Sequence, residues 1–313
     1  MNINHPITRR ESLKTLITIS GAVAFSGVSR FPLAALAQAK AAPKRFIVEG
    51  VGQTQAYSLK ELMRGVFDAA GGMTQFVSKG DVVAIKPNIS WARRPELAAT
   101  TNPQVLEAVI ELCYEAGAKK VRIVDHTIHD ARRCFAITGA GMVAKKTNAD
   151  LVFPRSSLMR QMKINGHRLN VWPVFVPLVE ADKLINLPVA KHHGLSSLTL
   201  GIKNWIGGVG GRRYALHQDI HQTIVDLAQF FRPTVTLIDA TRIMIRNGPS
   251  GGSPSDVAVK NTLILSNDQV AADALATGLF GHRPEDMGFI RLAKRSGLGT
   301  DDLNLLDQKR VVI

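Results

Sequence analysis

Short apolar segments alternate with helical segments from about residue 44 onward, and this alternation constrains the fold more than any other feature. The segment 81–86 (DVVAIK) is nearly continuous in apolar residues, which is typical of a strand covered on both faces of a sheet. Asn102 and Pro103 then mark a helix start, because Asn caps a helix and Pro fits its first turn. Gly117 ends this helix before the next apolar segment, 121–125 (VRIVD). The strand–helix–strand order predicts an α/β fold with a mostly parallel open sheet flanked by helices.

The segment 155–180 departs from this alternation, and we expect it to form a small antiparallel insertion. Residues 162–171 predict a hairpin about Asn165 and Gly166, a strong turn pair. The remaining chain predicts strands at 46–48, 174–176, 183–186, 234–239 and 262–265, and helices at 58–70, 217–231, 268–279 and 284–295. Ser58 and Asp268 are the expected caps of two of these helices. Residues 40–313 are therefore expected to form one α/β domain, with two lobes, 40–180 and 181–313, as an alternative division.

The N-terminal segment carries a targeting pattern. Residues 8–14 (TRRESLK) resemble the bacterial twin-arginine export signal, with Ser12 where that signal usually has Phe. The apolar stretch 16–28 is shorter than the ~20 residues that a membrane-spanning helix needs. Small residues at 35, 37 and 39 fit a cleavage site. We therefore expect a signal peptide at 1–39, export in the folded state through the twin-arginine translocase, a periplasmic protein and no stable membrane span after cleavage. An uncleaved anchor is the alternative.

The charge of the chain favours an anionic ligand. The net charge is +14, and it falls to +11 without residues 1–39, which hold four basic residues and one acidic residue. Such a charge attracts a small anion, an anionic membrane surface or nucleic acid, or only keeps the protein soluble. Export and the 6% aromatic content argue against nucleic acid, which is commonly bound by stacking on aromatic rings.

Two cysteines, Cys113 and Cys134, cannot supply the four thiolates of an ordinary iron–sulfur cluster. We therefore expect no such cluster of the protein's own. Cys113 lies in a helical pattern and is expected to pack as a small apolar residue. Whether the two cysteines form a disulfide is left open by the sequence, because their separation in space is unknown.

Titratable side chains follow several of the predicted strands, where ligands bind in open α/β sheets. Lys86, Asp125, His192 and His193 are the candidate catalytic residues. His192 is the first choice for general acid–base catalysis, because an imidazole titrates near neutral pH. Residues expected to hold an anion or a cofactor follow in the same region: Lys191, Lys203, Asn204, Gly207, Gly208 and Arg212.

The glycine-rich run 207–211 (GGVGG) has two interpretations. Successive backbone N–H groups of such a run can point into one concavity and bind an anion. The run lacks the spacing of a nucleotide-binding loop, so a nucleotide is not indicated. The alternative is a flexible surface loop.

His217 and His221 lie four residues apart, a spacing that lets two imidazoles on one helix face share a metal ion. Asp239, at the end of a predicted strand, is the third candidate ligand of a divalent metal. The pair lacks the embedded glutamate of the stronger metal motif, so a metal-free protein is the alternative.

Several motifs taken together resemble the domain-of-unknown-function family three-six-two (DUF362). They are Lys86-Pro87-Asn88, Val124-Asp125, Lys191-His192, residues 198–204 (LTLGIKN), Ile238-Asp239-Ala240, Asn247-Gly248-Pro249 and residues 268–273 (DQVAAD). The resemblance covers about residues 44–303 and implies a prokaryotic protein, often with a twin-arginine leader and sometimes fused to iron–sulfur modules. It implies no settled activity. The chain is also distantly similar to the nickel-pincer lactate racemases, which implies Lys203 as a cofactor anchor and histidines as acid–base or metal groups.

The hypothesis from the sequence is an exported enzyme that acts on a small anionic substrate of the carboxylate type, with or without a metal or another cofactor. The alternative is a non-catalytic binding protein or an accessory subunit of an exported redox complex with iron–sulfur clusters, which would have a redox subunit as its partner. Whether the chain is an enzyme is left open at this point.

Overall fold

The computed structural model describes residues 44–53 and 57–313. The expected signal peptide at 1–39 and its cleavage site lie outside these residues. Within the described chain, no helix is both long and apolar enough to cross a membrane.

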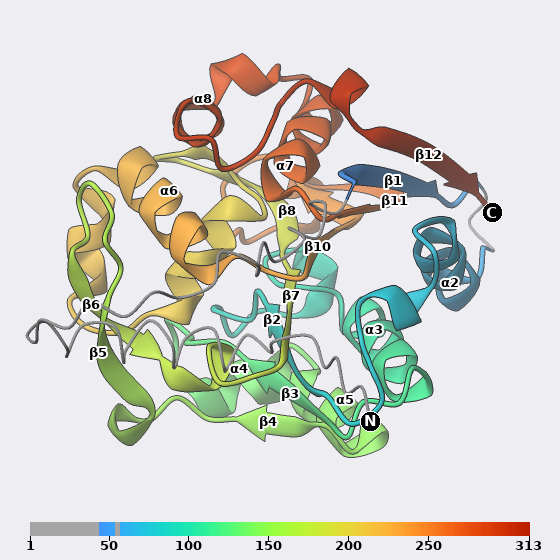
Figure 1. Ribbon diagram of the computed structural model, residues 1–313, viewed down its shortest axis with the longest axis horizontal. Helices are drawn as coiled ribbons and strands as arrows, with labels where there is room; N and C mark the ends of the chain where they lie inside the picture. The colour runs from blue at the N-terminus through green and yellow to red at the C-terminus, as the bar shows by residue number, and fades with distance from the viewer. Residues whose placement is uncertain (1–43, 54–56) are drawn as a thin grey trace, which may run out of the picture.

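One large sheet forms the centre of the described chain. Its strands follow the order β12-β1-β11-β10-β7-β2-β3-β4, with β8 beside β10 and β9 beside β8 (Figure 1). Most neighbouring strands are parallel, whereas β11 runs antiparallel to both β1 and β10. This mostly parallel α/β sheet confirms the predicted fold class. The strands are β1 (Phe46–Val51), β2 (Val82–Pro87), β3 (Lys120–Val124), β4 (Asp150–Val152), β7 (Lys183–Leu187), β8 (Val189–His193), β9 (Ser197–Thr199), β10 (Val235–Met244), β11 (Val257–Ser266) and β12 (Asp307–Val312).

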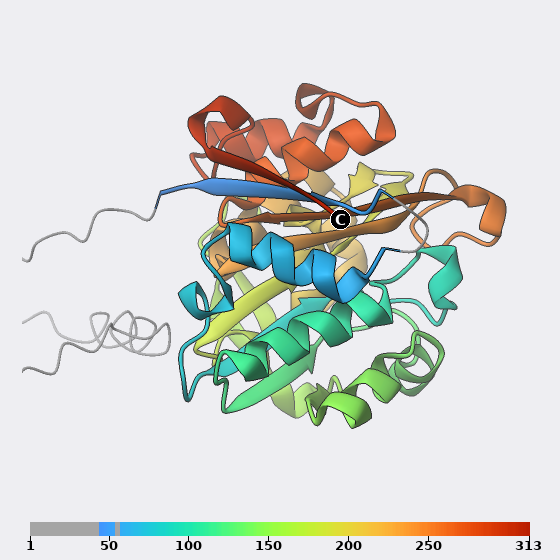
Figure 2. The same cartoon turned by 90° about the vertical axis from the view of Figure 1, so that its right-hand side faces the viewer.

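Helices cover both faces of the sheet (Figures 1 and 2). Successive residues of one strand enter different hydrophobic clusters, as side chains alternate across a strand. In β11, Leu263 and Leu265 pack with α2 and α3 residues, whereas Ile264 packs in the cluster that includes α6, α7 and α8 residues. The same division separates Leu237 from Ile238 in β10. The helices are α2 (Leu59–Ala69), α3 (Pro103–Glu115), α4 (Ala131–Ile137), α5 (Ala140–Thr147), α6 (Ile220–Phe231), α7 (Gln269–Thr277) and α8 (Gly288–Arg295).

The two candidate lobes, 40–180 and 181–313, share this sheet. Strand β1 lies between β11 and β12, and β7 lies between β10 and β2. Each half of the chain therefore supplies strands that are hydrogen-bonded to strands of the other half.

The expected helix caps are present. The Glu61 N–H donates to Ser58 Oγ at 3.3 Å, and the Gln104 N–H donates to Asn102 Oδ1 at 3.0 Å. The Val270 N–H donates to Asp268 Oδ1 at 2.9 Å. Each bond satisfies a backbone donor that has no partner inside its helix.

The predicted antiparallel insertion is the separate two-stranded sheet of β5 (Met159–Lys163) and β6 (Val171–Phe175). Asn165 lies at its turn with φ 54°, a left-handed conformation that Asn tolerates. The hairpin tip is fixed to α6, because the backbone N–H groups of Arg168 and Leu169 donate to Asp226 Oδ2 at 2.7 and 2.9 Å.

Two segments differ from the expectations. Strands β8 and β9 lie within residues 189–199, for which the sequence predicted no strand. The helix expected from His217 begins instead at Ile220, with Asp219 as its cap. His217 ends a preceding 3-10 helix, η7 (Arg213–His217). The spacing of Asp219 and Gln222 fits a helix cap, and the Gln222 N–H donates to Asp219 Oδ1 at 3.4 Å.

Candidate functional site

A cavity of about 520 Å³ is lined by residues from the end of β2, from the segment after β3 and from strand β8. Four basic side chains line it, and no aspartate or glutamate is among the described residues that line it: the four are Lys86, Lys191, Lys203 and Arg213. We call this space the cationic cavity. Its volume suits a small molecule.

Lys86, at the end of β2, forms a buried ion pair. Its Nζ lies 2.8 Å from Asp125 Oδ1, and their side chains are 1% and 0% exposed. The same Nζ donates to Asn204 Oδ1 at 2.8 Å. Asn204 in turn donates through Nδ2 to the Lys86 carbonyl oxygen at 3.0 Å and to Asn186 Oδ1 at 2.9 Å. Adjacent parallel strands therefore bring Lys86 and Asp125 together, as their positions at strand ends predicted.

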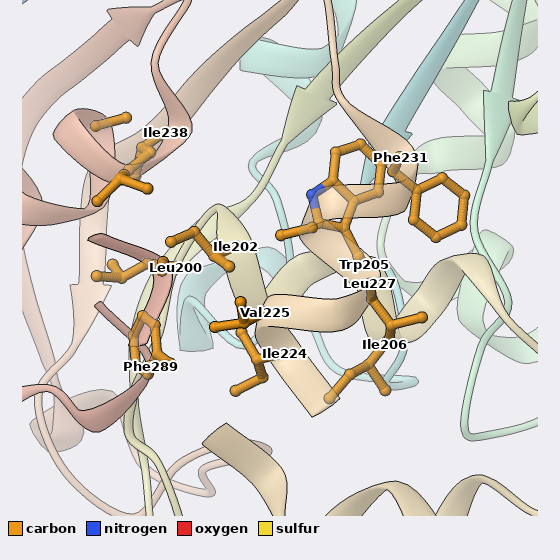
Figure 3. Packing of buried hydrophobic residues seen from close by; sticks show 14 of the residues in the cluster. Leu200, Ile202, Trp205, Ile206, Ile224, Val225, Leu227, Phe231, Ile238 and Phe289 are labelled. Carbon is orange, nitrogen blue, oxygen red and sulfur yellow. The ribbon is translucent and has the colours of Figure 1, made fainter. Parts of the chain in front are cut away.

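The 3-10 helix η6 (Ile202–Gly208) positions the next residues of the cavity. Side chains three residues apart coincide on a 3-10 helix. Ile202 and Trp205 share the face buried against α6, where Trp205 stacks on Phe231 with ring centroids 4.8 Å apart (Figure 3). Lys203 and Ile206 share another face, which lines the cavity. Burial of Trp205 thus fixes the direction of Lys203.

Asp273 of α7 anchors the start of η6. The N–H groups of Gly201 and Ile202 donate to its carboxylate at 2.6 and 2.9 Å. A Cβ on Gly201 would lie 2.7 Å from Asp273 Oδ1, so this approach requires glycine. The α7 helix therefore contributes to the position of Lys203 without touching the cavity.

Gly207 belongs to the third face of η6, against the ion pair. A Cβ at this position would lie 2.1 Å from Asp125 Oδ1 and 2.6 Å from Lys86 Nζ. Its carbonyl oxygen accepts a hydrogen bond from the His126 N–H at 2.8 Å. Gly207 and Gly208 are buried, and residues 207–210 pack inside the protein instead of forming the flexible surface loop considered above. Glycine is needed at 207 for close contact between backbone and ion pair.

The other basic side chains differ in their partners. Lys191 donates through Nζ to the Ala99 carbonyl oxygen and, at 3.3 Å, to Asn88 Oδ1. Arg213 donates through Nη1 to the carbonyl oxygens of His126 and Thr127 at 2.8 and 3.1 Å. Lys203 is buried at 7% exposure, and its Nζ forms no hydrogen bond or ion pair within the described chain.

Burial disfavours the charged form of these lysines. It lowers the pKa of Lys203 to about 7, and repulsion from Lys86 and Arg213 adds to the effect. Burial also lowers the pKa of Lys191, with repulsion from Lys203 as the next cause. The pKa of Lys86 is lowered by burial as well, while Asp125 opposes that change. The cluster therefore holds amines that can be neutral near neutral pH.

His193, the last residue of β8, lines the cavity as a neutral imidazole. Its Nδ1 accepts hydrogen bonds from the N–H groups of Leu195 and Ser196 at 3.1 and 3.3 Å. The ring proton therefore lies on Nε2. Burial lowers the pKa of His193 to about 3, and Lys203 and Lys191 contribute by repulsion. At neutral pH this imidazole can donate a hydrogen bond but carries no exchangeable positive charge.

Two buried polar atoms among the lining residues lack a hydrogen-bond partner in the described chain: Thr199 Oγ1 and Arg213 Nε. Buried polar groups are normally satisfied, and exceptions concentrate at functional sites. Neither residue was a candidate from the sequence. Thr199 lies in the motif 198–204, and Arg213 is next to the candidate Arg212. The motif and the neighbouring candidate could therefore have identified both residues from the sequence.

Four of the residues expected to act in catalysis or to hold a ligand lie outside the cavity lining: Asp125, which is paired with Lys86, and His192, Arg212 and Gly208. His192 accepts a hydrogen bond at Nδ1 from the Gly248 N–H at 3.1 Å, and its neighbour His193 lines the cavity instead. Arg212 is exposed, and Arg213 lines the cavity in its place. Gly208 packs against Phe231 and Leu178, where a Cβ would lie 2.6 Å from the Phe231 ring.

The three candidate metal ligands are not assembled into one site. Within the described chain, no group of three or more His, Cys, Asp or Glu side chains is arranged to hold a metal ion. His217 lines the cavity, whereas the His221 ring stacks on Phe289 with centroids 6.3 Å apart. Asp239 accepts hydrogen bonds from the Asn102 N–H at 2.7 Å and the Thr241 hydroxyl at 2.7 Å. The bond from Asn102 ties β10 to the start of α3.

Both cysteines, Cys113 and Cys134, are buried free thiols. Burial raises the pKa of Cys113, so its thiol stays protonated. Its place in the cluster between the sheet and α3 agrees with the expected role as a small apolar residue.

The chain is similar to known proteins in sequence and in structure. The thylakoid-associated protein sll1697 of Synechocystis sp. is 28% identical over 252 residues, which cover 78% of this chain and 77% of that protein. Among solved structures, the lactate racemase apoprotein from Thermoanaerobacterium thermosaccharolyticum is similar with a TM-score of 0.44 and 14% identity. That match covers 75% of this chain and 56% of the racemase chain, so this chain spans little more than half the length of that structure.

The model of the family described as Domain of unknown function (DUF362) matches residues 83–278. This range contains all four basic residues of the cationic cavity, the whole of η6 and every strand from β3 to β11. The chain belongs to the DUF362 family.

Proposed function

We propose that the protein is an enzyme that binds a small carboxylate anion in the cationic cavity and acts on it there. The observation that carries this proposal is the charge balance around the cavity. Four basic side chains line it, and the one carboxylate near them, Asp125, is already paired with Lys86 at 2.8 Å.

An anion resolves an electrostatic conflict in this cluster. Buried charges are normally paired, because an unpaired charge loses its hydration without compensation. Lys203 has no acceptor within the described chain, and Arg213 Nε is also unsatisfied there. A bound carboxylate supplies two acceptor oxygens, which fits an ammonium and a guanidinium N–H together.

The lowered pKa values of the buried lysines favour catalysis over simple binding. A pure anion-binding site works best with permanent positive charge, which arginine supplies. This cavity contains three lysines beside its one arginine, Arg213, and burial lowers the pKa of Lys203 to about 7. A group that titrates near the working pH can give and take protons, as an enzyme requires. We assign the reactive group to Lys203, in place of His192.

The apolar residues of the cavity limit the chemistry of the part of the substrate that lies beyond its carboxylate. Six apolar or aromatic residues line the cavity beside the basic groups: Trp91, Ile128, Leu195, Ile206, Tyr214 and Pro249. Leu195 and Tyr214 are 63% and 69% exposed. A ligand with a carboxylate at one end and an apolar body would cover these side chains while its charged end met the lysines.

The test is a ligand screen by thermal unfolding of the full chain in chloride buffers that contain no other anion. Carboxylates should raise the melting temperature, because a ligand that binds only the folded state stabilises it by about 2.7 kcal/mol at 100 times its Kd. Matched amides, which lack the charge, are the control. The double variant Lys191→Met with Lys203→Met should lose the effect of carboxylates. Equal responses to acids and amides would refute the proposal.

We also propose that the protein is exported to the periplasm, an assignment supported by residues 8–14 and the small residues at 35–39. The double variant Arg9→Lys with Arg10→Lys keeps the charge and should leave the protein in the cytoplasmic fraction, because the translocase reads the arginine pair. N-terminal sequencing of the periplasmic protein should begin near residue 38 or 40. Unaltered fractionation of the double variant would contradict this route.

A further inference from the structure

The three lysines of the cationic cavity are not equivalent. Lys86 is held by Asp125 and Asn204, and Lys191 is held by the Ala99 carbonyl oxygen and Asn88. All of these partners are acceptors, which bind the protons of an ammonium. Lys203 has no such partner in the described chain, so nothing there favours its charged form.

Its surroundings favour the neutral amine. The charged and titratable groups that face Lys203 are Lys86 of β2, Lys191 and His193 of β8, and Arg213 and His217 of η7. Every one of them is basic, and Asp125, the carboxylate of this cluster, is paired with Lys86. A lysine in a desolvated pocket beside other cations is an activated nitrogen nucleophile.

We infer that Lys203 acts as a nucleophile and forms an imine with the carbonyl carbon of a 2-oxo carboxylate bound in the cationic cavity. This inference rests on the proposed function and extends it by naming the substrate class and the covalent step. It also distinguishes Lys203 from its neighbours: Lys191, at 1% exposure and bonded to the main chain, is less accessible than Lys203, at 7%.

The other groups of the cavity match the two ends of such a substrate. Arg213 Nε and the remaining N–H of Lys191 Nζ can donate to the carboxylate. His193 can donate from Nε2 to the carbonyl oxygen, because its Nδ1 is occupied by two backbone N–H groups. A hydrogen bond to that oxygen draws electrons away from the carbonyl carbon and assists attack.

The step balances without an additional reactant. The amine lone pair forms the C–N bond, and the carbonyl oxygen takes up protons and leaves as water. The amine nitrogen loses two hydrogens overall, the C=O bond is replaced by C=N, and hydrolysis reverses the reaction. The protonated imine then accepts an electron pair from the adjacent carbon, so a C–H or C–C bond beside the former carbonyl breaks more easily.

The experiment is reductive trapping on the full chain. The protein is incubated at pH 7 with pyruvate, or with 4-methyl-2-oxopentanoate, which has an apolar side chain, and with cyanoborohydride. Peptide mapping by mass spectrometry then locates the adduct. We expect Lys203 to be labelled at least ~tenfold faster than an exposed lysine such as Lys79, because a far larger fraction of its amine is neutral at this pH.

The pH dependence gives a second readout. Labelling of Lys203 should rise with a midpoint near the pKa of about 7, whereas labelling of exposed lysines should continue to rise toward 10.5, the ordinary lysine value. The variant Lys203→Arg keeps the positive charge and removes the nucleophile. It should lose the adduct, and L-lactate, which has a carboxylate but no carbonyl, should still stabilise it against heat.

The outcomes separate the two proposals. Thermal stabilisation by L-lactate and by the 2-oxo acids without an adduct would overturn the imine and leave the carboxylate site standing. An adduct on Lys191, or equal labelling of Lys203 and Lys79, would overturn the assignment to Lys203. Absence of stabilisation by every carboxylate would remove the proposed function itself. Because the adduct is mapped on the wild-type protein, the test does not depend on the folding of Lys203→Arg.

Discussion

Replacement of Lys203 by methionine should stabilise the protein in the absence of anions. The wild-type side chain is buried among basic groups, and its Nζ has no acceptor in the described chain. Burial lowers its pKa to about 7, whereas the unfolded chain has the ordinary value of 10.5. Methionine has a similar length, no charge and enough flexibility to fill the same space. The variant therefore removes an electrostatic cost with little change in packing.

The magnitude follows from these two values. One pH unit of difference corresponds to 1.36 kcal/mol, so the interval from about 7 to 10.5 gives about 5 kcal/mol as an upper bound. Because the folded pKa is lowered, the cost is fully present below pH 7, where the folded protein must carry the charge. Between pH 7 and 10.5 the unfolded chain binds the proton and the folded chain does not, so wild-type stability rises with pH. The advantage of Lys203→Met should therefore shrink across that window.

The assay is urea unfolding at pH 6, 7, 8 and 9 in chloride buffers, followed by circular dichroism. Lys79→Met is the control, since Lys79 is exposed and forms no ion pair within the described chain; it should leave stability nearly unchanged. A carboxylate ligand should narrow the difference between wild type and Lys203→Met, because in the wild type the bound charge also stabilises the ammonium of Lys203. If Lys203→Met is less stable than the wild type at pH 6, or if the difference is independent of pH, the electrostatic account of the cluster is wrong.

Three further variants test the surroundings of Lys203. Gly207→Ala should destabilise the protein and abolish carboxylate binding, measured by thermal unfolding, because its Cβ would lie 2.1 Å from Asp125 Oδ1. Asp125→Asn should cost about 3–5 kcal/mol in urea unfolding, because it leaves the ammonium of Lys86 buried without a counter-charge; an unchanged midpoint would contradict the ion pair. His193→Gln should flatten the loss of stability on acidification from pH 6.5 to about 3, because burial lowers the pKa of His193 to about 3 and the unfolded chain alone takes up a proton in this window; identical acid profiles of variant and wild type would refute a buried neutral imidazole.

The position of the site was predictable from the sequence because parallel strands end at a common edge. Lys86 and Asp125 end adjacent strands, and Ile85 of β2 is paired with Ile123 of β3. The residues that follow must then approach each other. Hydrophobic segments locate strands well, so residues at their ends are located with them.

The choice between neighbouring residues was not predictable, because it depends on which side of an element each side chain takes. In strand β8, His192 and His193 point to opposite faces, and only the second reaches the cavity. Arg212 and Arg213 present the same problem at the start of η7. These short segments have no hydrophobic alternation from which the face of each side chain could be predicted. Contacts with residues distant in the sequence determine which side chain faces the cavity.

The start of helix α6 decides whether His217 and His221 can share a metal ion. A spacing of four brings His217 and His221 together only if both lie in one helix. Asp219, three residues before Gln222, is a helix start signal between the two histidines, and the structure begins α6 after it. That signal was visible in the sequence, and it argued against a shared helical face.

A buried cluster of lysines lowers the free energy of unfolding. Its presence despite this cost indicates a role other than stability. A sequence selected only for stability would have apolar side chains in place of Lys203 and Lys191. Well-packed apolar groups are often at least as stabilising as buried charges. The protein instead fixes Lys203 in direction: Trp205 stacks on Phe231 and Asp273 holds the start of η6. This support keeps the Lys203 amine in surroundings that lower its pKa to about 7, so that it can be neutral near neutral pH. If the proposed carboxylate binds there, it would recover part of the stability that the buried lysines cost, and the affinity for the ligand and the instability of the free protein would have a common origin.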